Sequence, residues 1–476
     1  MNTRTRSLIL LFFGITLITF SHMRWGIGLL AWLAPVPFLL FLYQTKGTKS
    51  RLLIIGAMCL AWTLTTTKII TDPLPLVAAL GYGIPIGLIF SAGFLFWDKL
   101  RHRVPNALSA IVFAAVMISI EWVQHRFTPL GSWGAAANSQ LENLTFLQSV
   151  SLAGIAAVAL PMYWFAALLA QAIHEKNIPF RQSSILAVLL ISLHVYGGIR
   201  LGNVTIIEHT KVAAIGTDAA FGGMPLPEPD EVTKVNNTLF QRSEEAAKNG
   251  AKLISWTEAA TMTHLDDEAA FIKRGQAFAA KHQVELVMSY IVPIDVAPLK
   301  YNNKYVWIGE DGKLRHDYLK HEPVPGEPAV RGIKPQVLAQ TAFGPAAGAI
   351  CYDYDFPYLG LENARLNPGL VVLPSSDWKG IDPIHAQMAS VRAIEGGYSL
   401  LRPTRFGLSV AYDAKGRVRG WQSANEEGPG IMIANVPTKP IPTLYKTAGD
   451  WLVYLAIVFL LAIALMPILP LKRCGT

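Results

Sequence analysis

The sequence predicts two parts in one chain, a polytopic α-helical membrane domain with eight spans and an α/β domain of layered sheets and helices. Of the 476 residues, 52% are hydrophobic and only 16% are charged, whereas an average soluble domain has about 25% charged residues. The apolar residues gather near the two ends of the chain, and residues 203–445 alternate polar and apolar stretches as a globular domain does. Two solvents, lipid and water, are therefore implied.

Eight apolar runs are long enough to cross a bilayer, which takes about 17 to 25 helical residues. These predicted spans are residues 7–23, 26–43, 52–68, 77–97, 107–125, 147–172, 183–201 and 450–470. The first resembles a signal peptide, but no small-residue cleavage site follows, so we expect it to stay as an anchor. The predicted domains are a seven-span domain over 1–202, a catalytic domain over 203–445, and the eighth span with a short cytoplasmic tail over 446–476.

Basic residues predict the orientation of the spans. With a cytoplasmic N-terminus, the loops on that side carry twelve Lys and Arg, and the opposite short loops carry only Arg24, Lys68 and Arg126. This bias places residues 203–445 outside the cytoplasm. The net charge of +8 is then mostly a topology signal. No basic face interleaved with aromatics is evident in the sequence, so we predict no nucleic-acid partner.

Cys351 is the only cysteine in the polar part of the chain, and it follows the apolar run Ala346 to Ile350. Cys59 falls inside a predicted span and Cys474 in the predicted cytoplasmic tail, so Cys351 has no partner for a disulfide within its domain. An unpaired thiol is a liability in an oxidising compartment. A lone thiol at the end of a predicted strand is a candidate nucleophile, although free cysteines are often small buried hydrophobes.

Two upstream residues complete a catalytic order of Glu, Lys and Cys. Glu258 follows the apolar run 253–256 and is suited to take the thiol proton, and Lys320 follows a predicted strand. A lysine ammonium and the backbone N–H of Tyr352, the residue after the nucleophile, are suited to stabilise an oxyanion. Glu327, a second carboxylate near the lysine, is suited to orient it.

The α/β domain is predicted from short strands that alternate with helices. We expect strands at 211–216, 253–256, 284–291, 301–309, 313–318, 348–351, 370–374, 398–402 and 408–412, and helices at 232–249, 266–282 and 383–395. Candidate catalytic groups at strand ends between such elements favour a layered α/β sandwich.

At these residues the chain resembles the nitrilase (carbon-nitrogen hydrolase) superfamily, whose members use a Glu-Lys-Cys triad on an αββα sandwich. With seven spans before that domain and one after it, the chain looks like the membrane-bound apolipoprotein N-acyltransferase family. Further segments that resemble this family are 121–122, 130–133, 139–140, 376–378, 385–389, 392–395, 400–404, 406–408, Tyr445 and 449–451.

The resemblance implies that Cys351 is the nucleophile, Glu258 the general base, Lys320 the oxyanion stabiliser and Glu327 a supporting carboxylate. It implies transfer of an acyl chain from a phospholipid, through a cysteine thioester, to the N-terminal α-amine of a diacylglyceryl-cysteine lipoprotein. The partners would be these two lipids and the bilayer. The location would be the bacterial inner membrane, multi-pass, with the catalytic domain on the periplasmic side.

Further site predictions follow from the turn after the nucleophile and from those segments. Tyr352 and Asp353 are expected to support the nucleophile, and Trp133, Trp378 and His385 are expected to contact substrate. Asp353 stands where the family usually has Glu, and the loop after Lys320 is one residue shorter than the usual form.

Competing interpretations remain at this point. A membrane-anchored nitrilase-type amidase or hydrolase would use the same triad with water as acceptor, and a scaffold on a degenerate nitrilase domain would use none of it. The eleven histidines show no H-x-x-x-H pair, so no metal is predicted, and no cofactor either. A transporter would ordinarily carry ionisable groups deep in its spans. In the predicted spans of this chain, Glu121 and His194 are the few candidates for such groups.

Overall fold

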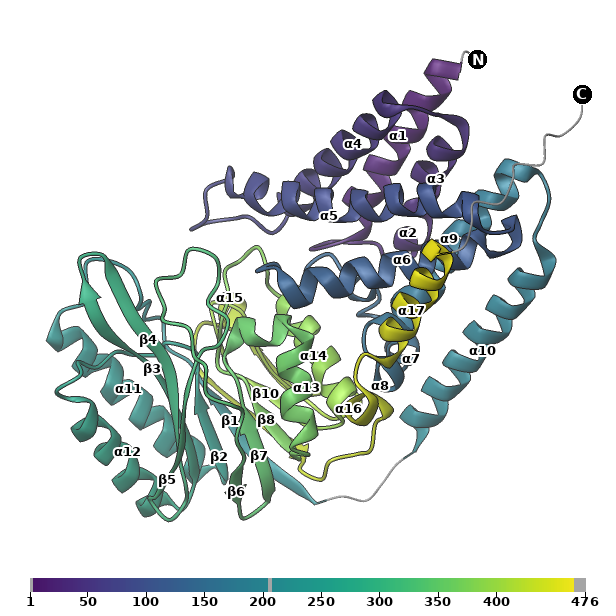
Figure 1. Cartoon of the computed structure of the whole chain (residues 1–476). Helices are drawn as coiled ribbons and strands as arrows, with labels where there is room; N and C mark the ends of the chain where they lie inside the picture. The colour runs from purple at the N-terminus through teal and green to yellow at the C-terminus, as the bar shows by residue number, and fades with distance from the viewer. Residues whose placement is uncertain (1–2, 204–207, 466–476) are drawn as a thin grey trace, which may run out of the picture. The chain divides into compact units, whose positions relative to one another are not determined.

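The computed structural model describes residues 3–203 and 208–465, which form two compact units. The helical unit contains the residues up to Gly202 and those from Ala448 onward, and the α/β unit contains residues 203–447 (Figure 1). The chain therefore leaves the helical unit once and returns to it with its last helix.

Apolar helices make up the helical unit. The longer ones are α1 Thr3–Ser21, α2 Gly28–Leu33, α3 Pro35–Gln44, α4 Thr48–Thr66, α5 Ala78–Leu100, α6 Asn106–Phe127, α9 Ala156–Glu175, α10 Phe180–Gly202 and α17 Trp451–Leu465. Short helical turns lie between α6 and α9, namely η2 Ala136–Ser139, α7 Leu144–Leu147 and α8 Val150–Ala153. Glycines bring α4 and α5 together, because a Cβ on Gly83 or Gly87 would overlap the backbone of Thr63 or Cys59.

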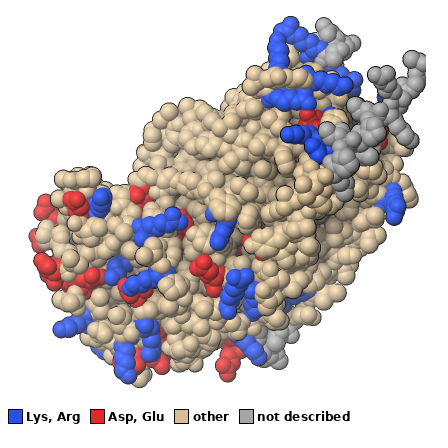
Figure 2. Space-filling view, viewed as in Figure 1, with Lys and Arg blue, Asp and Glu red and all other residues tan. Residues whose placement is uncertain are grey.

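Within the described residues, five helices are long and apolar enough to cross a membrane. They are Arg4–Ser21, Ala78–Arg103, Asn106–Phe127, Ala156–Glu175 and Phe180–Gly202, and they coincide with five of the eight predicted spans. Figure 2 shows Lys and Arg gathered at the end of this unit where α1 begins, above a face almost free of charge. Several apolar helices of membrane-spanning length are therefore present.

The other three predicted spans differ in form. Residues 26–43 form the shorter apolar segment Gly28–Gln44, interrupted at Ala34 because Pro35 and Pro37 lack the N–H that a continuous helix needs. Residues 52–68 lie mostly in α4, and the last predicted span begins as α17 and continues beyond the described residues. The sixth predicted span starts late because Gly154, with φ of 64°, ends α8 before α9 begins.

Two six-stranded sheets form the centre of the α/β unit. The first has the order β14-β1-β2-β3-β4-β5 and the second β13-β12-β10-β8-β7-β6. The strands are β1 His209–Ile215, β2 Leu253–Trp256, β3 Glu285–Val296, β4 Leu299–Ile308, β5 Leu314–Leu319, β6 Ala339–Thr341, β7 Gly344–Gly348, β8 Leu370–Val372, β10 Ser399–Arg402, β12 Leu408–Tyr412, β13 Val418–Ser423 and β14 Ile431–Pro437. A two-stranded ladder, β9 Ser375–Ser376 with β11 Thr404–Arg405, completes it.

Helices cover the outer faces of both sheets (Figure 1). α11 Pro229–Lys248 and α12 Glu268–His282 pack on the first sheet, and α13 Pro357–Arg365 and α14 Ile384–Gly396 belong to the second. The sheets share a core of buried residues that includes Val212, Leu253, Trp307, Leu370, Val371 and Leu400. The result is the predicted αββα sandwich, and β1-β2-β3 and β7-β8-β10 are its parallel sets.

Candidate active site

A largely buried ion-pair cluster lies just beyond the ends of β2 and β5 and beside the middle of β4 in the first sheet. Lys320, directly after β5, donates from Nζ to Glu258 Oε1 at 2.7 Å and to Glu327 Oε2 at 2.7 Å. Asn303, on β4, donates from Nδ2 to the same Glu258 oxygen, Oε1, at 2.8 Å and to the other Glu327 oxygen, Oε1, at 2.9 Å. Both carboxylates are thus fixed by the same two donors.

Electrostatics keep this lysine charged. Burial lowers the pKa of Lys320, but the Glu258 and Glu327 carboxylates more than offset that effect, and the pKa lies well above its usual value. Burial likewise raises the pKa of Glu327, yet Lys320 and the hydrogen bond from Asn303 reverse the shift, and the pKa is lowered. A charged Lys320 ammonium bonded to both Glu258 and Glu327 is therefore the resting state of the cluster.

Cys351 begins the tight 3₁₀ turn η3, Cys351–Asp355, which follows β7 in the second sheet. Its φ is 46°, a left-handed value that L residues seldom adopt, so the turn holds the side chain in a constrained position. Its backbone N–H donates to Pro374 O at 2.9 Å, and its Sγ lies 3.6 Å from Ser376 O. Only 3% of the residue is exposed.

Burial raises the pKa of the Cys351 thiol well above its usual value, and the Glu258 charge raises it further, while Lys320 acts in the opposite direction. The resting side chain is therefore a thiol. Because a thiolate is the reactive form, a base must remove the proton during reaction. Glu258 is the carboxylate whose charge acts most strongly on the thiol.

The Glu258 turn is connected to the small β9-β11 ladder. Glu258 lies two residues beyond β2, its backbone N–H donates to Ser375 O at 3.2 Å, and the next residue, Ala259, has a φ of 47°. The Glu258 turn and the Cys351 turn thus each contain a non-glycine residue with positive φ. Such strain persists only where surrounding contacts hold it, and it is common at functional sites.

Asp353 joins the lysine loop to the nucleophile turn. One carboxylate oxygen accepts from the backbone N–H groups of His321 at 3.0 Å and Glu322 at 2.7 Å, and the other accepts from Ile350 N at 2.9 Å and Tyr318 Oη at 2.8 Å. Burial raises the pKa of Asp353 to about 6, and the backbone donors limit the rise. The short Asp side chain therefore reaches both segments.

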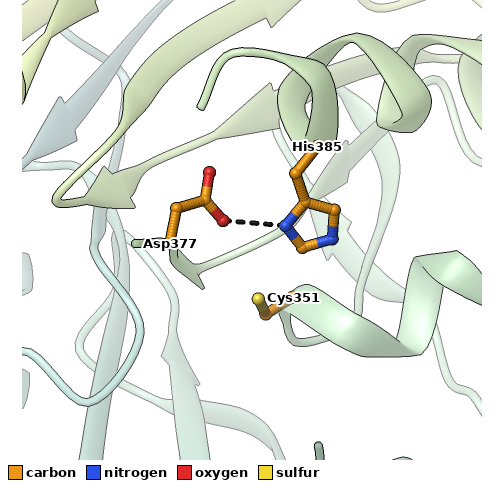
Figure 3. Close-up of side chains that lie close together, drawn as sticks. All are labelled: Cys351, Asp377 and His385. Carbon is orange, nitrogen blue, oxygen red and sulfur yellow. Dashed lines mark hydrogen bonds and ion pairs between the residues drawn. The ribbon is translucent and has the colours of Figure 1, made fainter. Parts of the chain in front are cut away.

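A second buried charge cluster lies on another side of the thiol. His385, in the first turn of α14, bonds through Nδ1 to Asp377 Oδ1 at 2.7 Å and through Nε2 to Asp355 Oδ1 at 3.0 Å. Arg402, at the end of β10, donates to both oxygens of Asp377, at 2.8 and 3.0 Å. Figure 3 shows the side chains of Cys351, Asp377 and His385 converging from three segments.

This second cluster limits what His385 can do. Burial lowers its pKa, but Asp355 and Asp377 reverse the shift and raise it to about 9, so the imidazole is protonated at neutral pH. With both nitrogens engaged by carboxylates, it is poorly suited to take a proton from Cys351.

Cys351, Asp377 and His385 also offer ligand atoms within 4.8 Å of one another, the spacing of a metal site. However, Arg402 binds both Asp377 oxygens. A histidine must also be neutral to bind a metal, and His385 is protonated at neutral pH. The donor set does not fit a metal in this arrangement.

Comparison with known proteins supplies the family. Residues 219–442 match the carbon-nitrogen hydrolase family model, and residues 15–168 match that of the apolipoprotein N-acyltransferase N-terminal domain. The chain is 27% identical over 421 residues to an apolipoprotein N-acyltransferase of Bradyrhizobium diazoefficiens, covering 78% of this chain and 76% of that protein. It is 24% identical to one from Gloeobacter violaceus, covering 90% and 88%.

The chain belongs to the apolipoprotein N-acyltransferase family. Among solved structures, an amidase from Nesterenkonia sp. is 18% identical with a TM-score of 0.42, covering 53% of this chain and 98% of the amidase. One family model matches the helical N-terminal part of the chain, and the other matches its αββα part. The catalytic domain of this acyltransferase-family chain is therefore nitrilase-like.

The structure places the predicted site residues of this family member as follows. Glu258, Lys320 and Glu327 share one buried cluster, and Cys351 with Tyr352 and Asp353 forms the adjacent turn. The Tyr352 ring is buried and packs edge-on against Phe356, with ring centroids 5.3 Å apart.

The three predicted substrate contacts are spread over both units. Trp378 is half-buried after β9, His385 is buried in the second charge cluster, and Trp133 is buried in the helical unit. Gln124 donates to the backbone carbonyls of Gly131 and Trp133, at 3.0 and 2.7 Å, and holds that loop. The substrate-binding role of the three residues stays a prediction.

Sequence reasoning missed four polar residues at this site. Asp377 and Arg402 lie in segments that resemble the family, so their presence there was a usable signal. Asn303 stands in an alternating strand and Arg405 in a two-residue ladder, and neither position has a local pattern that indicates an active site.

Proposed function

We propose that this protein is an apolipoprotein N-acyltransferase that transfers an acyl chain from a phospholipid to the N-terminal α-amine of a diacylglyceryl-cysteine lipoprotein. The observation that carries the proposal is the Glu258–Lys320–Glu327 cluster, in which the charges of Glu258 and Lys320 act on the thiol of Cys351. Family membership and the apolar helices support lipid substrates rather than freely soluble ones.

In the first half-reaction, Glu258 takes the proton of the Cys351 thiol, and the thiolate attacks the ester carbonyl of the phospholipid. The Lys320 ammonium and the Tyr352 backbone N–H stabilise the oxyanion of the tetrahedral intermediate. The intermediate collapses with cleavage of the ester C–O bond, and Glu258 returns its proton to the departing alkoxide. The products are a thioester on Cys351 and a lysophospholipid.

In the second half-reaction, the α-amine of the lipoprotein attacks the thioester carbonyl, and Glu258 accepts a proton from the attacking nitrogen. The C–S bond breaks, an amide forms, and the proton returns to sulfur. The enzyme is regenerated, so the scheme is ping-pong and needs neither water nor an oxidant. Glu327 and Asn303 hold Glu258 and Lys320 in place throughout.

The membrane arrangement belongs to the same proposal. The chain would cross the inner membrane of a bacterium eight times, with residues 203–445 on the periplasmic side. The bias of Lys and Arg toward one set of loops supports this orientation. Both lipid substrates would then reach a site that stands at the membrane surface.

The alternative of a nitrilase-type amidase or hydrolase is less favoured, because the helical N-terminal part matches the acyltransferase family and not a soluble hydrolase. A non-catalytic scaffold is less favoured too, because Glu258, Lys320 and Cys351 are all retained and buried at one site.

Intact-protein mass spectrometry tests the proposal. Detergent-purified wild type and Cys351→Ala are incubated with phospholipid and no acceptor. We expect an added acyl mass on the wild type alone, which a diacylglyceryl-cysteine peptide then removes as the N-acyl product. An unmodified, folded wild type would contradict acyl transfer, and release of free fatty acid without peptide acylation would favour a hydrolase.

A further inference from the structure

Arg405 is a buried arginine that the mechanism above does not use. It lies in β11, where it pairs with Ser376 of β9 in the small ladder of the α/β unit. Only 8% of the residue is exposed. Its neighbours are the Glu258 turn and the segment that faces the Cys351 sulfur.

The hydrogen bonds of Arg405 go only to neutral groups. Nε and Nη2 donate to Ser376 Oγ at 3.2 and 3.0 Å, and Nη1 donates to Ala219 O at 2.8 Å and Ala259 O at 3.2 Å. No carboxylate of the described residues forms an ion pair with it, in contrast to Arg402 with Asp377. A buried charge without a counter-ion is costly and is seldom retained without a function.

These contacts connect the two strained turns. Arg405 holds the carbonyl of Ala259, the positive-φ residue that directly follows Glu258. It also holds the hydroxyl of Ser376, whose carbonyl faces Cys351 Sγ at 3.6 Å. One guanidinium therefore fixes both the Glu258 turn and the Ser376 segment beside Cys351. Its planar group of N–H donors suits contacts to several acceptors at once.

The charge of Arg405 matters as well as its shape. Glu258 and Glu327 place two negative charges around the single ammonium of Lys320, an arrangement that opposes formation of a thiolate nearby. Burial lowers the pKa of Arg405, and Glu258, Tyr301 and Cys351 act in the opposite direction. Arg405 is therefore a cation that contacts the Glu258 turn through Ala259 O and the Ser376 residue whose carbonyl lies beside Cys351 Sγ.

We propose that Arg405 is a positioning residue that holds the Glu258 turn against the Ser376 segment and adds a further positive charge, beside those of Lys320 and Arg402, in favour of the Cys351 thiolate. The inference rests on the proposed function only in taking Cys351 as the nucleophile. Arg405 acts through Glu258 and Cys351 and need not contact the acyl chain.

The test measures the reactivity of the thiol as well as turnover. Iodoacetamide alkylation of the Cys351 peptide is followed by mass spectrometry across pH in wild type, Arg405→Gln, Arg405→Lys and the exposed control Arg419→Gln, below their unfolding temperatures. We expect Arg405→Gln to shift the apparent thiol midpoint upward by about one pH unit and to slow alkylation about tenfold at neutral pH. Arg419→Gln should match wild type.

Arg405→Lys separates charge from geometry. It keeps the positive charge, so the alkylation midpoint should stay within about 0.3 units of wild type, while phospholipid acylation of Cys351 should fall because Ala219, Ala259 and Ser376 lose their shared donor. This variant also carries the test if Arg405→Gln does not fold. An unmoved midpoint in Arg405→Gln, or an equal shift in both variants, overturns the proposal.

Failure of the function and failure of this inference are distinguishable. Alkylation requires no acyl donor, so a shifted midpoint in Arg405→Gln supports the inference even if wild type transfers no acyl chain to a lipopeptide. Conversely, acyl transfer by wild type with an unmoved Arg405→Gln midpoint upholds the function and rejects the role of Arg405.

Discussion

Two charge clusters lie near Cys351, and they differ in balance. The Glu258–Lys320–Glu327 cluster has two carboxylates and one ammonium, whereas the cluster of Asp355, Asp377, His385 and Arg402 has two carboxylates and two cations.

The first cluster has a carboxylate that can accept a proton, and its charge acts directly on the thiol. In the second cluster both imidazole nitrogens and both Asp377 oxygens are engaged. The comparison teaches that proximity to a nucleophile does not by itself make a group catalytic. The proposed base, Glu258, differs from His385 in that its bonds come from Lys320 and Asn303, and no carboxylate in the described part of the chain holds it.

Loss of the nucleophile should have the largest effect and should leave both clusters intact. We expect Cys351→Ala to lower acyl transfer by at least about 10⁴-fold while the thermal unfolding midpoint changes little. The measurement is N-acylation of a diacylglyceryl-cysteine peptide, with Cys59→Ala as the matched control. Retained turnover in Cys351→Ala would remove the nucleophile assignment.

Removing the single cation of the first cluster should be nearly as damaging. Lys320→Met leaves two buried carboxylates facing each other without a counter-ion, so we expect a loss of about 3–5 kcal/mol in stability and about 10²- to 10³-fold in acylation. Thermal unfolding and single-turnover acylation measure the two losses.

A second substitution sharpens this result. Lys320→Met with Glu327→Gln should recover part of the stability, because one unpaired charge is gone, but no activity. The exposed Lys313→Met is the control. A Lys320→Met protein as stable as Lys313→Met would contradict the ion-pair account of this cluster.

Substitutions in the second cluster should mainly change the free energy of unfolding, by an amount that depends on pH. The pKa of His385 is about 9, above the unfolded value of about 6.5, so its protonated form contributes about 3 kcal/mol to stability. That contribution is complete below pH about 6.5 and is lost as pH rises through about 9. His385→Gln should therefore be destabilised most at low pH.

The check is the thermal midpoint of wild type and His385→Gln between pH ~6 and ~10, where the gap should shrink. The exposed His264→Gln controls for histidine loss. A gap that widened with pH would mean that His385 is neutral, and the difference between the two clusters would disappear.

Asp353 should give the smallest of these effects, because it acts on both the lysine loop and the nucleophile turn only through hydrogen bonds. We expect Asp353→Asn to cost about 1–3 kcal/mol, since its amide group cannot accept from all four donors, and to lower acylation about tenfold through misplacement of Lys320. Asp266→Asn, on the surface, is the control. Equal activity of the two variants would show that Asp353 does not position the site.

Much of the fold could be predicted because it depends on local periodicity. Strand 253–256 is found at the predicted residues as β2, and the predicted hairpin of 301–309 and 313–318 is β4 with β5. Strands β13 and β14 were missed, because the exposed edge strand Val418–Ser423 alternates weakly and Ile431–Pro437 follows a Gly/Pro-rich stretch.

Less of the candidate site could be predicted, because its contacts join distant segments. Asn303 lies in β4, a strand with no catalytic signature. The pairing of β4 with β5 brings it to the lysine, because its carbonyl accepts from Lys320 N at 2.9 Å, and its side chain then reaches Glu258 and Glu327. His385 was expected to contact substrate, and the fold places it between Asp355 and Asp377.

The sequence by itself determined the division into apolar and polar parts and the placement of Glu258, Lys320 and Cys351 at strand ends, because hydrophobic periodicity and charge are local properties. Tertiary structure alone decided which charges meet. Lys320 lies 2.7 Å from two carboxylates, and Arg405 lies near Cys351 without one. The physical reason is that pairing depends on how two sheets pack, and burial then sets the cost and the pKa of every charge between them.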